Sequence, residues 1–432
     1  MRLLDTLKDG DLIEAKSFRK LFPKEVYELL VTISREGFSL TLVGGAVRDW
    51  LLTSELPHDL DFELRHTFDY DESDWIFRLN RLGERLREIY HYDVEFLSFS
   101  IMRISWSGLP FDVELGPARV EVYDTQSEGH GHSDFKALLK SNASYEETFK
   151  RRDFTLNALG VELRSPNTDD EFVFVDPFKG REDLNKMLLR PCGENFSKDP
   201  VRFCRALRFA NKYSLSYSES LVKCFGKFNL SHLSHFYFFR EGLKGNFFKF
   251  SHDFFSLCEE YSIPYNDELK KIAFLKGNKL QSLHLRNEEE VLLALLYKGE
   301  ASVKELEDFS EVATIKKGLV SSHLIFRDTV NELSHLNLTP VSSAQDFCKD
   351  PLSALLLTFH QFLSKTSRDT FSLIGRLNPD FYKVYLDWGK IVPANLEGKE
   401  LFEQLQESVP PAHRGKLLIY CHLKETKQIE CS

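Results

Sequence analysis

The pattern of hydrophobic and polar residues changes near residue 186. Residues 38 to about 185 contain short alternating or β-rich runs, such as FSLTLV and DVEFLSFSIMRIS, mixed with helical segments. This mixture predicts a sheet with helices packed on it. After residue 186, strands are hard to find, and Leu, Phe and Lys recur at helical spacing, as in residues 290–299 and 353–365. We therefore predict an α+β fold, with a small mixed sheet and helices in the N-terminal part and an all-helical remainder.

The composition places this chain among globular proteins. Its 432 residues, of which 42% are hydrophobic, are enough for about two to four domains with proper cores. We find no apolar run long enough to cross a bilayer and no cleavable leader, so we expect no membrane partner. The seven cysteines are scattered, odd in number and never arranged as CxxC. This argues against disulfide partners and a zinc site, and it favours a reducing, cytoplasmic location.

The formal net charge is −10. Proteins that bind nucleic acid without sequence preference over a long track usually carry a strong positive excess, because neutralisation of phosphates drives that binding. The charge therefore argues against such a protein. Any contact with nucleic acid should come from local basic patches on an otherwise acidic molecule.

A glycine pair separates a predicted strand from a predicted helix. Residues 38–42 alternate as a strand with one buried face would, Gly44 and Gly45 end that strand, and residues 46–52 resume at helical spacing. A turn of this kind leaves backbone N–H groups at a helix N-terminus, where they can hold a phosphate. Taken alone, such a turn is more often structural.

Acidic residues follow on the same face of the next predicted strand. In residues 59–64, Leu60, Phe62 and Leu64 point one way, and Asp59, Asp61 and Glu63 point the other. Asp112 and Glu114 share a face of a later strand. Neighbouring carboxylates repel one another and remain ionised most readily around a cation, and oxygen ligands suit Mg²⁺ better than zinc. A solvated edge of the sheet is the alternative explanation for an isolated DxD.

Four ordered motifs make the chain resemble the class II tRNA nucleotidyltransferases, in the superfamily shared by CCA-adding enzymes and bacterial poly(A) polymerases. Together they cover about residues 38 to 215. The motifs are GGAVRD (44–49) with DLD (59–61), KRRDFTLNAL (150–159), DPFKGREDLNKMLLR (176–190) and DPVRFCRALRFA (199–210). The resemblance implies a nucleotidyltransferase head at residues 1–185, a helical neck that reads the nucleotide base at 186–260, and a helical body and tail that bind tRNA at 261–432.

The resemblance also implies a role for each matching residue. Asp59 and Asp61 would be catalytic metal ligands, with Glu114 as the third carboxylate and Asp112 as the competing choice. Four residues would shape the triphosphate pocket, namely Gly44, Gly45, Arg48 and Asp49. Three others would line the ribose and phosphate side, namely Arg152, Asp153 and Asn157.

The fourth motif would read the incoming base with side chains. Asp199 and Arg202 match the positions that bind the Watson–Crick edges of CTP and ATP: a carboxylate accepts from an exocyclic amine, and an arginine donates to ring acceptors. Arg205 and Arg208 continue the row on one helix face, suited to phosphates. The sequence departs from the family at Lys198, where an acid is usual.

The resemblance implies addition of CCA to the 3′ end of tRNA from CTP and ATP, with Mg²⁺ as cofactor. A poly(A) polymerase, or an enzyme that adds only CC or only A, would share all four motifs and stays open. A non-catalytic RNA-binding protein is the alternative of another class. A metal phosphohydrolase is set aside, because His252-Asp253 is the one His-Asp dipeptide after the head and lacks further ligands at credible spacing.

Overall fold

The computed structural model describes residues 3–57, 60–107, 112–123, 132, 134–164, 171–278, 280, 283–298, 301–338 and 341–429. The chain divides into two compact units, Met1–Gly245 with Asp253–Asn266, and Asn246–His252 with Asp267–Ser432. The division falls within helix α11 (Phe247–Glu260). No helix in these described ranges is long and apolar enough to span a membrane.

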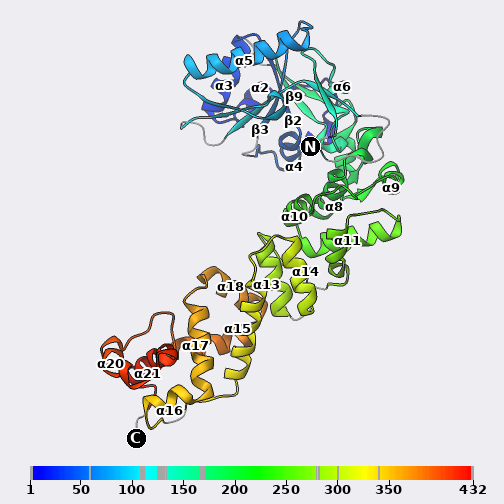
Figure 1. Ribbon diagram of the computed structural model, residues 1–432. Coiled ribbons are helices and arrows are strands. Elements are labelled where there is room, and N and C mark those ends of the chain that lie inside the picture. The colour runs from blue at the N-terminus through cyan, green and yellow to red at the C-terminus, as the bar shows by residue number, and fades with distance from the viewer. Residues whose placement is uncertain are drawn as a thin grey trace. The chain divides into compact units, whose positions relative to one another are not determined.

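The first unit is built on a mixed sheet (Figure 1). All neighbouring strands in this sheet run antiparallel except β3 and β6, which are parallel. The strand order is β1 (Leu12–Ile13), β10 (Glu171–Val175), β9 (Gly160–Arg164), β2 (Ser39–Val43), β3 (Leu60–Arg65), β6 (Val113–Pro117), β5 (Met102–Ser105) and β4 (Asp93–Phe96). A separate antiparallel pair is formed by β7 (Arg119–Val122) and β8 (Lys136–Leu139).

Strand β2 lies in the middle of the sheet and is covered on both faces. Leu40 and Leu42 are buried as the sequence predicts, but Thr41 between them is buried as well. The hydroxyl of Thr41 lies 2.7 Å from the hydroxyl of Tyr145, which satisfies its polar group. The expectation that this strand has one buried face is therefore wrong, because helices from both sides of the sheet cover it.

Helices complete the first unit. Asp71 caps α5 by accepting from the Asp74 N–H at 2.9 Å, and Gly83 of that helix lies where a Cβ would meet the Phe96 ring at 2.5 Å. This close approach holds α5 against β4. The helices are α1 (Leu3–Thr6), α2 (Ala15–Arg19), α3 (Lys24–Arg35), α4 (Gly45–Thr53), α5 (Glu72–Glu88), α6 (Tyr145–Phe149), α7 (Gly180–Asn185), α8 (Val201–Tyr213), α9 (Glu219–Phe225) and α10 (His235–Leu243).

The segment after the sheet packs through phenylalanine rings. Phe203 of α8 makes edge-to-face contacts with Phe225, Phe228 and Phe254 at centroid distances of 5.3–5.8 Å. Beside them, β11 (Leu188–Leu189) and β12 (Ser216–Tyr217) form a short parallel pair that the sequence did not indicate. The predicted α+β fold is confirmed, and this aromatic core attaches α8 firmly to the rest of the unit.

The second unit is helical throughout the part that the structure describes (Figure 1). Phe326 and Phe362 stack at its centre with ring centroids 3.8 Å apart, and the Trp388 indole N–H donates to the Leu333 carbonyl at 3.0 Å. Beyond the first turns of α11, its helices are α12 (Asp267–Lys271), α13 (Glu288–Lys298), α14 (Val303–Val312), α15 (Leu319–Leu333), α16 (Ala344–Lys349), α17 (Pro351–Leu363), α18 (Arg368–Leu377), α19 (Pro379–Ile391), α20 (Lys399–Leu405) and α21 (Arg414–Glu425).

Candidate active site

The glycine turn lies at the predicted junction between β2 and α4. Gly44 has φ of 78°, and a Cβ there would lie 2.9 Å from Nη1 of Arg152. Both observations require glycine, since other residues rarely adopt this conformation and a side chain would displace the arginine. Gly45 begins α4, whose N-terminus has no side-chain cap. The turn therefore brings a helix N-terminus next to Arg152.

Arg48 connects α4 to the second motif. Its Nη1 donates to Oδ1 of Asn157 at 2.5 Å, and its Nε donates to Asp49 at 2.8 Å. The guanidinium also lies over the ring of Tyr213, 4.9 Å from the centroid. Arg48 is buried. Through these bonds, Arg48 holds the side chains of Asp49 and Asn157 in place.

Two of the three predicted metal ligands, Asp61 and Glu114, lie on the parallel pair β3 and β6. Asp61 is directly opposite Glu114 in the strand register, and Asp61 is exposed. Glu114 accepts from Nη2 of Arg103 on β5 at 3.0 Å. Asp112 is exposed and immediately precedes β6. Asp59 lies outside the described residues. The register favours Glu114 over Asp112 as the neighbour of Asp61, and the choice of third carboxylate stays a prediction.

The second motif forms a buried polar network. Asn157 donates from Nδ2 to Oδ1 of Asp153 at 3.0 Å, and Arg205 of α8 donates from Nε to Oδ2 of Asp153 at 2.6 Å. Burial alone would raise the pKa of Asp153, but Arg205 and Asn157 outweigh it and hold the pKa at about 2. Asp153 is therefore a fixed anion that ties α8 to the sheet domain.

Asp199 and Arg202 lie together at the start of α8. Asp199 accepts from the Val201 N–H at 2.9 Å, and Nδ1 of His132 lies 3.0 and 3.1 Å from its two carboxylate oxygens. Arg202 donates from Nη2 to the Arg151 carbonyl at 2.7 Å, and its Nε lies 3.7 Å from Asp199. Both side chains are therefore held in place before any ligand arrives.

Two further residues, Arg208 on α8 and Lys198 three residues before that helix, have defined side-chain neighbours. The Nε of Arg208 donates to the buried Glu241 carboxylate at 2.6 Å, so Arg208 is paired with an acid of α10. Lys198, which stands where the family usually has an acid, has its Nζ 5.6 Å from the centroid of the Tyr123 ring. This lysine therefore lies over the Tyr123 ring.

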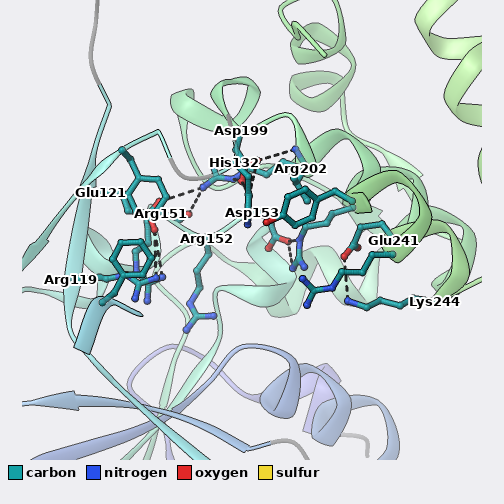
Figure 2. Close-up of a pocket in the computed structure, with 16 residues that line it drawn as sticks. Arg119, Glu121, His132, Arg151, Arg152, Asp153, Asp199, Arg202, Glu241 and Lys244 are labelled. Atoms are coloured by element: carbon teal, nitrogen blue, oxygen red, sulfur yellow. Dashed lines mark hydrogen bonds and ion pairs between the residues drawn. The ribbon is translucent and has the colours of Figure 1, made fainter. Parts of the chain in front are cut away.

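A cavity of about 360 Å³ opens between these groups (Figure 2). Of the predicted site residues, Arg152, Asp153, Asp199, Arg202 and Arg205 line it. The other predicted residues that the structure describes do not line it, although Gly44 lies close to Arg152, and Asn157, which accepts from Arg48, donates to Asp153. The remaining lining residues are Phe99, Arg119, Glu121, His132, Phe135, Arg151, Val201, Tyr237, Arg240, Glu241 and Lys244.

Three arginines of the lining repel one another. The Nε atoms of Arg119, Arg151 and Arg152 are buried and lack hydrogen-bond partners among the described residues. Burial, followed by the charges of Arg119 and Arg152, lowers the pKa of Arg151 to about 9. Burial also lowers the pKa of Arg119. Crowded, desolvated cations are stabilised by an anion, so this wall is suited to a phosphate group.

An inorganic polyphosphate should therefore stabilise the protein. We expect triphosphate at about 100 times its Kd to add about 2.7 kcal/mol to the free energy of unfolding and to raise Tm by several degrees. Arg152→Gln should reduce this shift by at least half, because Arg152 has no acid partner within the described part of the chain and lies against the glycine turn. Thermal unfolding with and without triphosphate measures it.

The control is Arg164→Gln, which removes a half-exposed arginine of β9 that pairs with Glu162. Arg164→Gln should keep the full shift, and sodium chloride at equal ionic strength should produce little of it in either protein. Equal triphosphate shifts in Arg152→Gln and the wild type would contradict an anion site at this wall.

Sequence reasoning missed several residues of this cavity. Glu121 lies between Arg119, Arg151 and Arg202 at 3.7–3.9 Å, and it could not be recognised because it belongs to no motif. Arg151 belongs to the second motif, KRRDFTLNAL, and could have been identified as a candidate site residue from that motif. Tyr237, Arg240, Glu241 and Lys244 come from α10 and the residue after it, a stretch whose likeness to the family is loose.

Comparison with known proteins finds a family model for the segment that supplies one side of this cavity, including Arg119, Arg151 and Arg152. A family model described as the poly A polymerase head domain matches residues 40–190. The match covers about a third of the chain, and this segment is similar to that head domain. The resemblance drawn from the motifs is thereby confirmed for the head.

Relatives of this head domain include the CCA-adding enzyme of Buchnera aphidicola subsp. Schizaphis graminum, which is 32% identical over 173 residues. The match covers 39% of this chain and 34% of that protein, so the chain spans about a third of the length of this curated relative.

Solved structures extend the likeness beyond the head as a likeness of fold. The structure of a CCA-adding enzyme in its apo form II has a TM-score of 0.61 at 14% identity, covering 98% of this chain and 100% of that one. A CCA-adding enzyme in complex with ATP has a TM-score of 0.60 at 14% identity, covering 97% and 95%. The chain therefore shares its fold with these enzymes along nearly its whole length.

Proposed function

We propose that this protein is a template-independent RNA nucleotidyltransferase that adds CCA to the 3′ end of tRNA from CTP and ATP. The observation that carries the proposal is a single cavity in which a base-reading pair, Asp199 and Arg202, shares the lining with the crowded arginines Arg119, Arg151 and Arg152. One wall suits a base and the other suits phosphates, as a nucleoside triphosphate requires. The name of the relatives, CCA-adding enzyme, supports the same reaction.

Selection of the base would follow from the donors and acceptors of the pair. The carboxylate of Asp199 accepts hydrogen bonds, and the guanidinium of Arg202 only donates. Cytosine and adenine both have an exocyclic amine next to a ring acceptor, which complements this pair, whereas uracil and guanine have the opposite pattern. The bond from Arg202 to the Arg151 carbonyl fixes the guanidinium plane, so selection would require no rearrangement.

The triphosphate would lie against the arginine wall and the glycine turn. Arg152 contacts the turn, and Asp153 orients Arg205 at the border of the same cavity. These cations would neutralise the charge that develops on the leaving pyrophosphate. The RNA 3′-hydroxyl would attack the α-phosphate, form the new phosphodiester bond and release pyrophosphate.

The carboxylates Asp59, Asp61 and Glu114 would hold the Mg²⁺ ions. Asp61 and Glu114 offer hard oxygen donors on directly opposite positions of two strands, which is a donor set that Mg²⁺ accepts. When bound, the metal lowers the pKa of the attacking hydroxyl and stabilises the leaving oxygen. Neighbouring carboxylates at this place are otherwise unfavourable because they repel one another.

Incorporation on three tRNA transcripts tests the proposal. They end before CCA, after the first C and after CC, and each is given CTP, ATP or both with Mg²⁺. Growth of every transcript to a discrete CCA end is expected. A long A ladder would instead make the protein a poly(A) polymerase, which the name of the matching head-domain family also allows. A stop at CC, or activity only on the transcript that ends in CC, would make it an enzyme that adds only part of CCA. RNA binding without nucleotide incorporation would show that the protein is not a nucleotidyltransferase.

A further inference from the structure

Two consecutive residues next to the cavity have positive φ angles, an unfavourable backbone conformation. Phe99 and Ser100, between β4 and β5, have φ of 60° and 57°. Residues other than glycine rarely adopt this conformation, and two in succession cost free energy that the surroundings must offset. Such strain is concentrated at functional sites, so the side chain presented by this turn is a candidate for a function.

The turn presents the Phe99 ring to the cavity. The ring is 38% exposed and belongs to the cavity lining. It stacks on Phe135 with centroids 5.5 Å apart and planes at 22°, and the guanidinium of Arg119 lies 4.8 Å from its centroid. Phe99 is thus a supported aromatic surface beside a cation, which is the chemistry that binds a nucleobase with its phosphate.

The aromatic wall continues from Phe99 toward the base-reading pair. Phe135 contacts Tyr123 at 5.7 Å between centroids, and Nη2 of Arg202 lies 3.5 Å from the Tyr123 hydroxyl. Figure 2 shows Arg119 on the opposite side of the cavity from Glu241 and Lys244. The platform formed by Phe99 and Phe135 therefore lies on the side of the cavity where Arg119 lies, and Tyr123 connects it to Arg202.

We propose that Phe99, backed by Phe135, stacks on the base of the 3′-terminal nucleotide of the RNA acceptor. This inference rests on the proposed function. Asp199 and Arg202 already supply the hydrogen bonds for the incoming base, whereas the platform supplies a flat apolar face without directional groups. The terminal base of the acceptor changes after each addition, and stacking tolerates such changes because every base has a π-face.

Steady-state kinetics of Phe99→Ala test which nucleotide the platform binds. We expect the KM for the tRNA transcript to rise about 5- to 150-fold, the range that corresponds to about 1–3 kcal/mol of stacking, with the KM for CTP and ATP unchanged. Phe99→Trp should retain wild-type values. The control is Phe77→Ala on α5, which removes a ring that is 64% exposed and does not line the cavity. A rise in the KM for CTP or ATP instead would overturn the assignment.

Equilibrium binding separates this inference from the catalytic proposal. A transcript whose last residue is abasic should bind the wild type more weakly than the intact transcript by the same factor. Phe99→Ala should bind both transcripts equally, because the base no longer has a partner. If the wild type binds both equally, the platform does not hold the terminal base. This result stands whether or not the protein incorporates nucleotides, so failure of one proposal is distinguishable from failure of the other.

Discussion

Asp61→Asn should lower nucleotide incorporation at least about 10³-fold, with little change in RNA binding. The substitution keeps the shape of the side chain and removes one of two carboxylates that are opposite each other on β3 and β6. Metal-assisted stabilisation of the transition state contributes several kcal/mol, and about 4 kcal/mol corresponds to this factor. Single-turnover incorporation of CTP and ATP at saturating Mg²⁺ measures it.

Asp93→Asn is the matched control for this experiment. Asp93 is an exposed carboxylate at the start of β4, on the edge strand of the same sheet. Its replacement should leave the incorporation rate within about twofold of the wild type, since surface substitutions change little. If Asp61→Asn and Asp93→Asn retain equal activity, the catalytic metal ligands lie elsewhere. Chelation of Mg²⁺ by EDTA should abolish incorporation in all three proteins.

Asp153→Asn should lower the free energy of unfolding by about 3 kcal/mol. Asp153 is buried, and its Oδ2 lies 2.5 Å from Nη2 of Arg205. Removal of the negative charge leaves the arginine next to the remaining cations without its counter-ion, and breaking one partner of a buried pair typically costs about 3–5 kcal/mol. We choose the lower end because the Arg205 side chain is 32% exposed. Urea unfolding measures it.

The pH dependence provides a second measure of the same pair. The pKa of Asp153 is about 2 in the folded protein, below its ordinary value of 3.8. Its contribution to stability is therefore complete above pH 3.8 and is lost as the pH falls toward 2. The difference in stability between the wild type and Asp153→Asn should shrink across this window.

Glu219→Gln is the control for Asp153→Asn. It breaks the ion pair between Glu219 and Lys223, whose side chains are 83% and 68% exposed. Exposed pairs of this spacing contribute about 0.3–0.5 kcal/mol, so the variant should unfold almost like the wild type. Equal losses of unfolding free energy for Glu219→Gln and Asp153→Asn would show that the buried pair stabilises the protein no more than an exposed pair.

The sequence predicted the parts of this site that lie in contiguous motifs. The glycine turn after a strand and the three-residue spacing of the arginines on α8 are local patterns that the sequence shows directly. The α+β division was predictable for the same reason. Asp153 and Asn157 were implied by the resemblance, and Asp153 lies just before the short 3₁₀ helix, Thr155–Asn157, that ends at Asn157. Strand β2 was mistaken for a half-buried strand because alternation of Leu40 and Leu42 does not reveal a buried Thr41 whose hydroxyl is satisfied by Tyr145.

Other parts could not be predicted, because they depend on contacts between distant segments. Glu121 and Phe99 belong to no motif, and their importance comes from Arg202 and Arg119, which other elements supply. The partner of Arg208 is Glu241, on a helix whose sequence carries only a loose resemblance. Long-range pairings of this kind leave no periodic signal in the sequence.

The parallel register of β3 and β6 has a consequence for the order of folding. Asp61 and Glu114 are roughly 50 residues apart in the chain, and α5, β4 and β5 lie between them. Closing a loop of this length is entropically costly, and parallel pairing forms slowly compared with local contacts. We therefore expect Asp61 and Glu114 to meet after the intervening helix and hairpin have assembled. If these carboxylates hold the metal as proposed, a nascent or partly refolded head should lack incorporation activity until the sheet is complete.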